Sequence, residues 1–285
     1  MAASKLGLFR FSWWTVNLLL VVSAAGLLYS GVWEFSVRRY LNGFSDAIVP
    51  NSAPPVQRVE AILEWMRFNT TRMVAPDPST LDSRNPEVTL GYRQLLAVCG
   101  SATSAFLNLA RSSDLKVRRL LLLSPNRRAK HVVAEVLIDG RWVIVDPLYR
   151  TLMRNRQGHL LTRSELRDPA LLAEATRSIP NYSSEYTYES SAHVRLARLP
   201  LEGLKLRALL DRIYPAWDEL IDWNLVLERE SATALVLSAS FTCLFLLSRA
   251  ALARYADQHL HVLRTHLREK AMRLGVALFT GAEFK

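Results

Sequence analysis

The stretch HVVAEVLIDGRWVIVD, residues 131–146, contains two short runs rich in valine and isoleucine, joined by Asp139-Gly140. Asp-Gly between two such runs is the strongest short-range signal of a two-residue β-hairpin turn. The sequence therefore predicts antiparallel strands over residues 131–138 and 141–147, in a register that the turn fixes. The expected pairs are Ile138 with Arg141, Leu137 with Trp142, Glu135 with Ile144, Val133 with Asp146, and His131 with Leu148.

Opposed residues of two paired strands, and alternate residues along one strand, share a face of the sheet. One predicted face is apolar and should pack on the core: Val132, Ala134, Val136, Ile138, Val143 and Val145. The other face carries His131 and Asp146 as diagonal neighbours, about 7 Å apart. At that spacing a carboxylate can orient an imidazole ring and stabilise its charged form. The side chains beside this pair, Val133, Glu135 and Trp142, are candidates for the wall of a pocket.

A helix is predicted upstream of the hairpin, beginning at Cys99, and is followed by a strand over residues 115–123. From this cysteine onward, small and apolar residues recur at helical spacing, which gives the helix one buried face. A thiol at a helix N-terminus, beside an imidazolium, has a depressed pKa and acts as a nucleophile. The order along the chain is therefore Cys99, His131 and Asp146, on a helix, a strand and the adjacent strand.

Each of these residues also has a simpler interpretation. Cys99 can be an inert core residue, which is the commonest fate of a free cysteine. His131 can merely begin a strand, and Asp146 can be a turn residue before Pro147. The joint occurrence of all three, in a register that aligns the last two, favours a catalytic site.

The stretches CGSATSAFLNLARSSDLKVRRLLL (99–122) and HVVAEVLIDGRWVIVDPLYR (131–150) resemble the transglutaminase-like superfamily. That family has a cysteine followed by small residues, then a run such as HaWvEv, then gW..vDpt. The resemblance implies an α+β, papain-like core, in which a cysteine-bearing helix packs on an antiparallel sheet. It also implies Cys99 as nucleophile, His131 as general base and acid, and Asp146 as the group that orients His131. A bacterial, membrane-anchored member of the family is expected.

Two positions depart from the family pattern, and both would alter the wall of the pocket. Val133 stands where a tryptophan is common, and Leu148 where a threonine is common, so the substrate cannot be transferred by analogy. Gln94 or Tyr92 is a candidate second donor to an oxyanion; both can equally be solvated residues. Eukaryotic transglutaminases require calcium, but no oxygen-rich loop of calcium-binding type is present, so we expect no metal and no cofactor.

Two apolar stretches are long enough to cross a bilayer, which takes about 20 apolar residues. The first, residues 12–35, has one charge, Glu34, and aromatic residues near both ends, as at membrane interfaces. An uncleaved anchor is favoured over a signal peptide cleaved near Val22-Ser23-Ala24, because the apolar run continues past that point. The second, residues 231–248, has no charge, and its alternative is a buried core helix. Cys243 lies within it.

The distribution of Lys and Arg around the two spans predicts the orientation in the membrane. More arginines follow the second span than precede it, so residues 249–285 are expected to form a cytoplasmic, basic, amphipathic tail along the inner leaflet. A continuation of the span or packing on a partner are the alternatives for this tail. With two spans, residues 1–11 are cytoplasmic too. Residues 36–230, with a core at about 56–170, then lie on the periplasmic or outer side of a bacterial plasma membrane.

Composition excludes several classes of protein. The 285 residues carry a net charge of +10, but basic and acidic side chains are mixed along the sequence rather than clustered, which disfavours nucleic-acid binding. Two cysteines cannot form a disulfide framework. A later tyrosine-rich stretch with Tyr182, Tyr186 and Tyr188 predicts a strand or an ordered loop, which could bind a peptide or glycan or simply form a sheet edge.

These patterns lead to two hypotheses of function. The first is a membrane-anchored cysteine enzyme, an amidase, protease or acyltransferase, that acts through a thioester on a peptide or polymer of the cell envelope. The second is a scaffold or binding module of an envelope or exopolysaccharide assembly complex, with a weak or inactive triad. The expected partners are the lipid bilayer and an envelope peptide, a polysaccharide-linked substrate or a protein.

Overall fold

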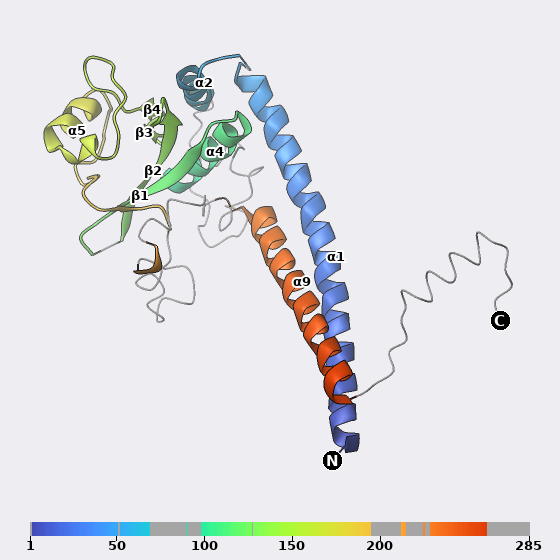
Figure 1. The fold of residues 1–285 in the computed structure, drawn as a ribbon. Helices are drawn as coiled ribbons and strands as arrows, with labels where there is room; N and C mark the ends of the chain where they lie inside the picture. Colours follow the sequence, from blue (N-terminus) through green and yellow to red (C-terminus); the bar gives the residue numbers. More distant parts are fainter. Residues whose placement is uncertain are drawn as a thin grey trace. The chain divides into compact units, whose positions relative to one another are not determined.

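The computed structural model describes residues 2–50, 52–68, 90, 98–126, 128–194, 212–214, 225 and 229–260. Contacts divide the chain into two units. The helical unit comprises Met1–Ala25 and Ser238–Lys285, and the domain unit comprises Gly26–Leu237 and contains the sheet (Figure 1).

The domain unit is built on an antiparallel sheet with the strand order β4-β3-β2-β1-β5. The strands are β1 (Val117–Leu123), β2 (Ala129–Ile138), β3 (Arg141–Asp146), β4 (Thr151–Leu152) and β5 (Ser191–Ala192). The predicted hairpin and its register are confirmed at three of the five expected pairs: Ile138 with Arg141, Leu137 with Trp142, and Glu135 with Ile144. The paired ladder ends at Ala134 and Val145, before the other two expected pairs. Asp139 and Gly140 have φ angles of +49° and +76°, the positive values that a tight hairpin turn of this type requires.

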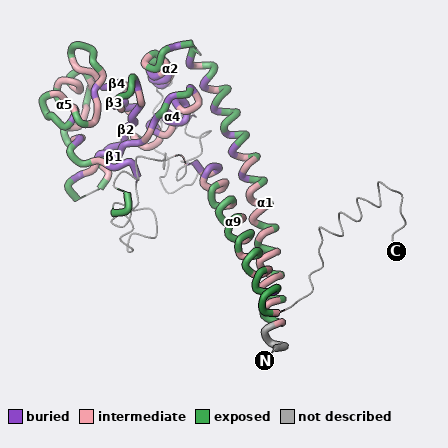
Figure 2. Tube along the Cα trace, viewed as in Figure 1, coloured by how far each residue is buried: buried purple, intermediate pink, exposed green. Residues whose placement is uncertain are grey.

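One face of the sheet is covered by helices α2 (Pro55–Phe68) and α4 (Cys99–Ser112). All the predicted apolar residues of the hairpin except Val132 lie in this core with the fully buried Phe106 of α4. Burial of one such large side chain contributes about 1.5–3 kcal/mol. Figure 2 shows α4 and the central strands largely in the colour of buried residues. The hairpin members of the core are Ala134, Val136, Ile138, Val143 and Val145.

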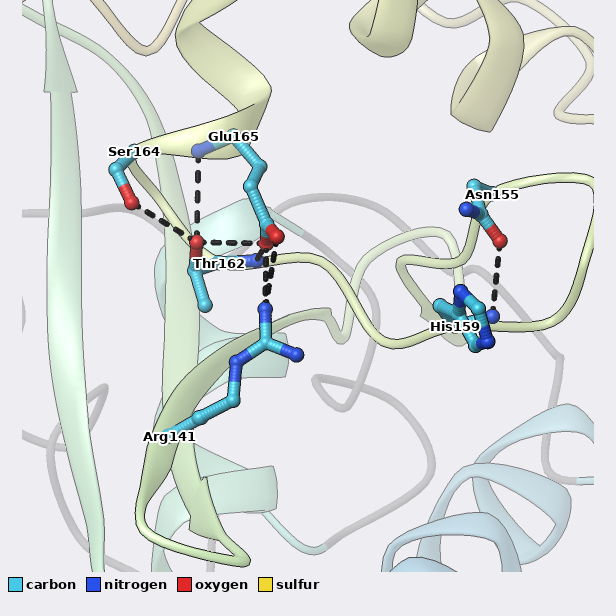
Figure 3. Close-up of polar contacts among 6 residues, drawn as sticks. All are labelled: Arg141, Asn155, His159, Thr162, Ser164 and Glu165. Carbon is cyan, nitrogen blue, oxygen red and sulfur yellow. Dashed lines mark hydrogen bonds and ion pairs between the residues drawn. The ribbon is translucent and has the colours of Figure 1, made fainter.

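The second face is covered by the chain between β4 and β5, which includes the 3-10 turn η2 (Glu165–Arg167) and helix α5 (Pro169–Thr176). Asp168 caps α5 by accepting a hydrogen bond from the Ala170 N–H at 2.9 Å. This covering segment is tied to β3 because Glu165 accepts two hydrogen bonds from Arg141, at 2.8 and 2.9 Å (Figure 3). The apolar residues of this face are Leu120, Leu122, Val133, Ile144, Met153, Leu161, Leu166 and Tyr188.

Helix α1 (Ala2–Ile48) runs without interruption through the end of the first predicted span. Its 47 residues correspond to about 70 Å, more than twice the thickness of a hydrocarbon core of about 30 Å. Its last turns belong to the domain core, where Val37 and Leu41 are buried. Ser45 is hydrogen-bonded to Ser113, just after α4, at 2.5 Å. The helix that carries the first candidate span therefore also contributes to the domain core.

Two helices are long and apolar enough to cross a membrane: Leu6–Ile48 of α1, and Glu230–Leu260, which comprises α9 (Glu230–Tyr255) and the π-helical η5 (Ala256–Leu260). None of the most apolar window of the second is buried, so the interpretation of this segment as a buried core helix is wrong. Phe241, Leu244 and Leu247 of α9 are each at least half exposed, as expected of a surface that faces lipid.

A buried polar cluster joins three helical segments of the domain unit. Glu34 of α1 accepts hydrogen bonds from Arg229, just before α9, at 3.0 Å, and from Ser231 at 2.6 Å. Arg229 also donates to the Asn108 side chain of α4 at 2.8 Å. Glu34 accepts a further bond from Arg38, whose side chain is 61% exposed. We call Glu34, Asn108, Arg229 and Ser231 the anchor cluster.

Candidate active site

The strands β2 and β3 bring His131 and Asp146 into direct contact. The Nε2 atom of His131 lies 2.7 Å from an oxygen of Asp146, and neither side chain has any exposed surface. The other carboxylate oxygen accepts hydrogen bonds from the backbone N–H groups of Leu148 and Tyr149, at 3.2 and 3.3 Å. The turn after β3 therefore fixes the carboxylate, and the carboxylate fixes the imidazole.

Cys99 is the first residue of α4, as the sequence predicts. The helix is held against β2 by Thr103, whose hydroxyl donates to the carbonyl of Val132 at 3.0 Å, next to His131 in sequence. The residue before the helix, Val98, is extended and has no side-chain oxygen to cap the first N–H groups. The first backbone N–H groups of α4 thus have no side-chain cap from Val98, and the N–H of Gly100 is directed at the thiol.

The electrostatics of the site favour a charged pair. Burial by itself would raise the pKa of the Cys99 thiol. The hydrogen bond and charge of His131, with the N–H groups of Val132 and Gly100, outweigh this and lower that pKa below its ordinary value. Burial would likewise lower the pKa of His131, but the hydrogen bonds and charges of Asp146 and Cys99 raise it to about 9.

The lowered thiol pKa and the raised imidazole pKa both favour the thiolate–imidazolium form of this coupled pair. Nε2 of His131 is committed to Asp146. The other ring nitrogen, Nδ1, is buried and makes no well-aligned hydrogen bond within the part of the chain that the structure describes. Nδ1 is thus the atom left to exchange a proton with the thiol or with a bound substrate.

Three tyrosines surround the His131 ring: Tyr149 after β3, and Tyr182 and Tyr186 between α5 and β5. The segment from Ile179 to Tyr188 is an ordered loop, not a strand. Burial, with the charge of Asp146 among other causes, raises the pKa of Tyr182 and of Tyr188, so both phenols stay neutral. The sequence left Tyr182, Tyr186 and Tyr188 open as a ligand-binding loop or a sheet edge. Contact of Tyr182 and Tyr186 with the imidazole depends on tertiary packing that local periodicity does not encode.

A cavity of about 320 Å³ lies beside this group and is lined by Leu148, Tyr149, Arg150, Ile179, Pro180 and Asn181. Arg150 and Asn181 have φ angles of +54° and +57°, which are uncommon outside glycine. The Tyr149 hydroxyl donates to the Asn181 carbonyl at 3.0 Å across the cavity wall. Backbone strain of this kind concentrates at functional sites.

The three predicted wall residues occupy different environments. Val133 is buried in the core of the second face. Glu135 is buried and accepts hydrogen bonds from Arg118 at 2.6 Å and from His193 at 2.9 Å. Trp142 lies under the guanidinium of Arg118, 4.1 Å from its ring centroid. Burial alone would raise the pKa of Glu135, but His193 and Arg118 lower it below the ordinary value.

The candidate oxyanion donors Gln94 and Tyr92 lie outside the described residues, as does the tail from residue 261 onward. Within the described part of the chain, no group of three or more His, Cys, Asp or Glu side chains could hold a metal ion.

The antiparallel sheet, the cysteine at the start of a helix and the buried His–Asp pair define a protein with a papain-like α+β core. Residues 42–147 match the family model of the transglutaminase-like superfamily. The predicted resemblance is confirmed, and the chain contains a transglutaminase-like domain that extends from the last turns of α1 to the residue after Asp146. No curated protein and no solved structure matches the chain.

Proposed function

We propose that this protein is a membrane-anchored cysteine enzyme that cleaves or transfers an acyl group through a thioester on Cys99. The observation that carries the proposal is the buried His131–Asp146 contact of 2.7 Å, which commits Nε2 and leaves Nδ1 for Cys99. A pair with no exposed surface is costly to bury, and it gives the thiol the base that nucleophilic catalysis needs.

In the first half of the reaction, the Cys99 thiolate attacks the carbonyl carbon of an amide or ester and forms a carbon–sulfur bond. The carbonyl oxygen becomes an oxyanion, for which the N–H of Cys99 at the start of α4 is the proposed donor. The carbon–nitrogen or carbon–oxygen bond then breaks. The leaving group takes the proton from Nδ1 of His131, and the thioester remains.

In the second half, water or an amine attacks the thioester and gives its proton to Nδ1 of His131. The carbon–sulfur bond breaks, and the thiolate–imidazolium pair is restored. Asp146 keeps the imidazole in one orientation through both halves and remains ionised. The choice between hydrolysis and transfer then depends on which acceptor reaches the thioester.

Two apolar helices and the distribution of arginines around them support the proposal that the domain acts outside the cytoplasm, on a peptide or polysaccharide-linked amide or ester of the cell envelope. The cavity beside Tyr149 is the proposed seat for a group next to the bond that is cleaved. A reporter active only outside the cytoplasm, fused after Lys285, should be inactive; activity there would contradict the orientation.

The test uses the full-length protein in detergent, with Cys243→Ser so that Cys99 is the one remaining thiol. The rate of alkylation by iodoacetamide is measured against pH in this protein and in its His131→Ala variant. We expect a thiolate well below pH 8.5, the value for a free cysteine, and a midpoint that returns to about 8.5 without His131. An ordinary midpoint that His131→Ala leaves unchanged would support the scaffold hypothesis instead.

A further inference from the structure

The ring of Tyr186 lies flat against the imidazole of His131. The two ring centroids are 4.2 Å apart, and the ring planes differ by 6°. Tyr182 and Tyr149 meet the imidazole at steeper angles, with centroid distances of 6.4 and 6.1 Å. All three tyrosines lie beyond residue 147, where the match to the family model ends, so this aromatic wall lies outside the matched residues.

The loop that carries Tyr186 is fixed on both sides of the ring. Tyr188 is fully buried in the core of the second face. The carbonyl of Ser190 accepts a hydrogen bond from the N–H of Leu123 at 2.9 Å, where β5 joins the sheet. Glu185 pairs with Lys130, the neighbour of His131, at 2.6 Å. The position of the Tyr186 ring is therefore set by several independent contacts.

A parallel aromatic ring at this distance affects the charged and neutral forms of an imidazole differently. The face of an aromatic ring is negative, so it attracts a cation placed over it, and it does so more strongly where water is excluded. The side chain of His131 has no exposed surface, and Tyr186 covers one side of it. The stack thus stabilises the imidazolium and restricts rotation of the ring out of the plane of the Asp146 bond.

We propose that Tyr186 is a positioning residue of the active site, whose aromatic face holds His131 as an imidazolium in the orientation that serves Cys99. The inference rests on the proposed function, since it concerns the base of the same reaction. The face of the ring, not the hydroxyl, carries the effect.

Several other titratable groups face His131 or its stacked tyrosine and contribute to the same equilibrium. Asp146 of β3 contacts the imidazole directly, and Cys99 of α4 acts on its pKa. Lys130 and Glu185 form an exposed pair beside Tyr186. Tyr149, Tyr182 and Tyr188 complete the set. None of these groups is altered by a substitution at position 186, so comparison of variants isolates the stacked ring.

The experiment compares Tyr186→Leu, which removes the aromatic face, with Tyr186→Phe, which keeps it, in the full-length Cys243→Ser protein. Alkylation of Cys99 by iodoacetamide is followed from pH 4 to pH 10. In Tyr186→Leu we expect the midpoint of thiolate formation to rise by about one pH unit, and the rate below the midpoint to fall about tenfold. Tyr186→Phe should stay within about twofold of the parent at every pH.

A spectroscopic measurement accompanies the kinetics. In protein labelled with ¹³C-histidine, the stacked ring should shift the Cε1 proton of His131 upfield in the parent and in Tyr186→Phe, and this shift should be lost in Tyr186→Leu. Tyr214→Leu makes the same change at a tyrosine that is 47% exposed and should alter neither measurement. Tyr186→Met is a second non-aromatic variant, for use if the leucine variant does not fold.

The outcomes separate the two proposals. If the parent shows a low thiolate midpoint but a folded, non-aromatic variant keeps it, this inference is wrong and the proposed function stands. If Tyr186→Phe raises the midpoint of thiolate formation as much as Tyr186→Leu does, the hydroxyl rather than the ring face stabilises the imidazolium. The inference is then again wrong. If the parent itself shows an ordinary thiol, the proposed function fails first.

Discussion

At the scale of single residues, the site depends on one carboxylate that serves several donors. Asp146 accepts from His131 through one oxygen and from two backbone N–H groups through the other. Its negative charge, not only its geometry, holds the pKa of His131 at about 9. Through His131, Asp146 thus also acts on the pKa of the Cys99 thiol.

Asp146→Asn should therefore weaken the nucleophile without a large change of shape. With no charge beside it, the imidazolium loses stability and the pKa of Cys99 rises. Each pH unit of that rise lowers the thiolate population about tenfold below the midpoint, so alkylation at pH 6 should fall by at least about that factor. Iodoacetamide kinetics measure the effect, and an unchanged rate would show that Asp146 only orients the ring.

The pH profile of alkylation should have two rising steps. Cys99 has a lowered pKa, so the first step lies below its ordinary value and marks formation of the ion pair. His131 loses its proton near pH 9, so above that value the thiolate is no longer paired and becomes a stronger nucleophile. In His131→Ala a single step near about pH 8.5 should remain. One step in the parent would contradict the coupled pair.

At the scale of secondary-structure elements, the hairpin and the tyrosine loop differ in what the sequence could predict. The hairpin is specified locally, because Asp139-Gly140 permits positive φ angles and the flanking valines alternate between two cores. The loop from Ile179 to Tyr188 has no comparable signal. Its course depends on the burial of Tyr188 and on contacts with β1 and β2 that are distant in sequence.

Gly140→Val should destabilise the domain, although a Cβ atom at this position would meet no neighbour within 4 Å. The cost arises from the backbone: at φ of +76° a β-branched residue is strained by roughly 1–3 kcal/mol. Gly140→Asn should cost less, because asparagine tolerates this region better. Denaturant unfolding of the two variants measures the difference, and equal losses would point to a cause other than φ.

Glu135→Gln should change how stability depends on acid. The pKa of Glu135 is lowered in the folded protein. The stability that its charged form contributes is therefore present above about pH 4.5, and it is lost as the pH falls through the pKa of the folded protein. The glutamine variant should be less stable at pH 7 by roughly 1–3 kcal/mol and lose less on acidification. Glu185→Gln, in an exposed pair with Lys130, should behave like the parent protein in thermal unfolding from pH 3 to 7.

At the scale of the whole molecule, the anchor cluster connects the helices that are candidates for membrane insertion to α4, the helix that begins at Cys99. Asn108 and Cys99 lie on the same helix, α4, and Arg229 joins Asn108 to Glu34 of α1. No sequence pattern indicated this cluster, because its members lie up to 197 residues apart along the chain. Such pairs are specified by tertiary packing alone.

Arg229→Met should be strongly destabilising, because it leaves the buried Glu34 carboxylate without its buried cation. The expected loss is about 3–5 kcal/mol. Arg38→Met removes the other arginine that binds Glu34, but its side chain is 61% exposed, so the loss should stay below about 1 kcal/mol. The free energy of unfolding of both variants is measured in the same detergent. Equal losses of stability would show that burial of the Arg229–Glu34 pair is unimportant.

The anchor cluster also constrains the order in which the chain can finish folding. Glu34 is synthesised early, whereas Arg229 follows 195 residues later, with Ser231 close behind. Until Arg229 and Ser231 leave the ribosome, Glu34 has Arg38 as its cationic partner. Helix α4, which begins at Cys99, has by then already been synthesised. Completion of the support of α4 is thereby linked to arrival of the second apolar helix, so a chain that stops short of residue 229 would carry Cys99, His131 and Asp146 on an unfinished support.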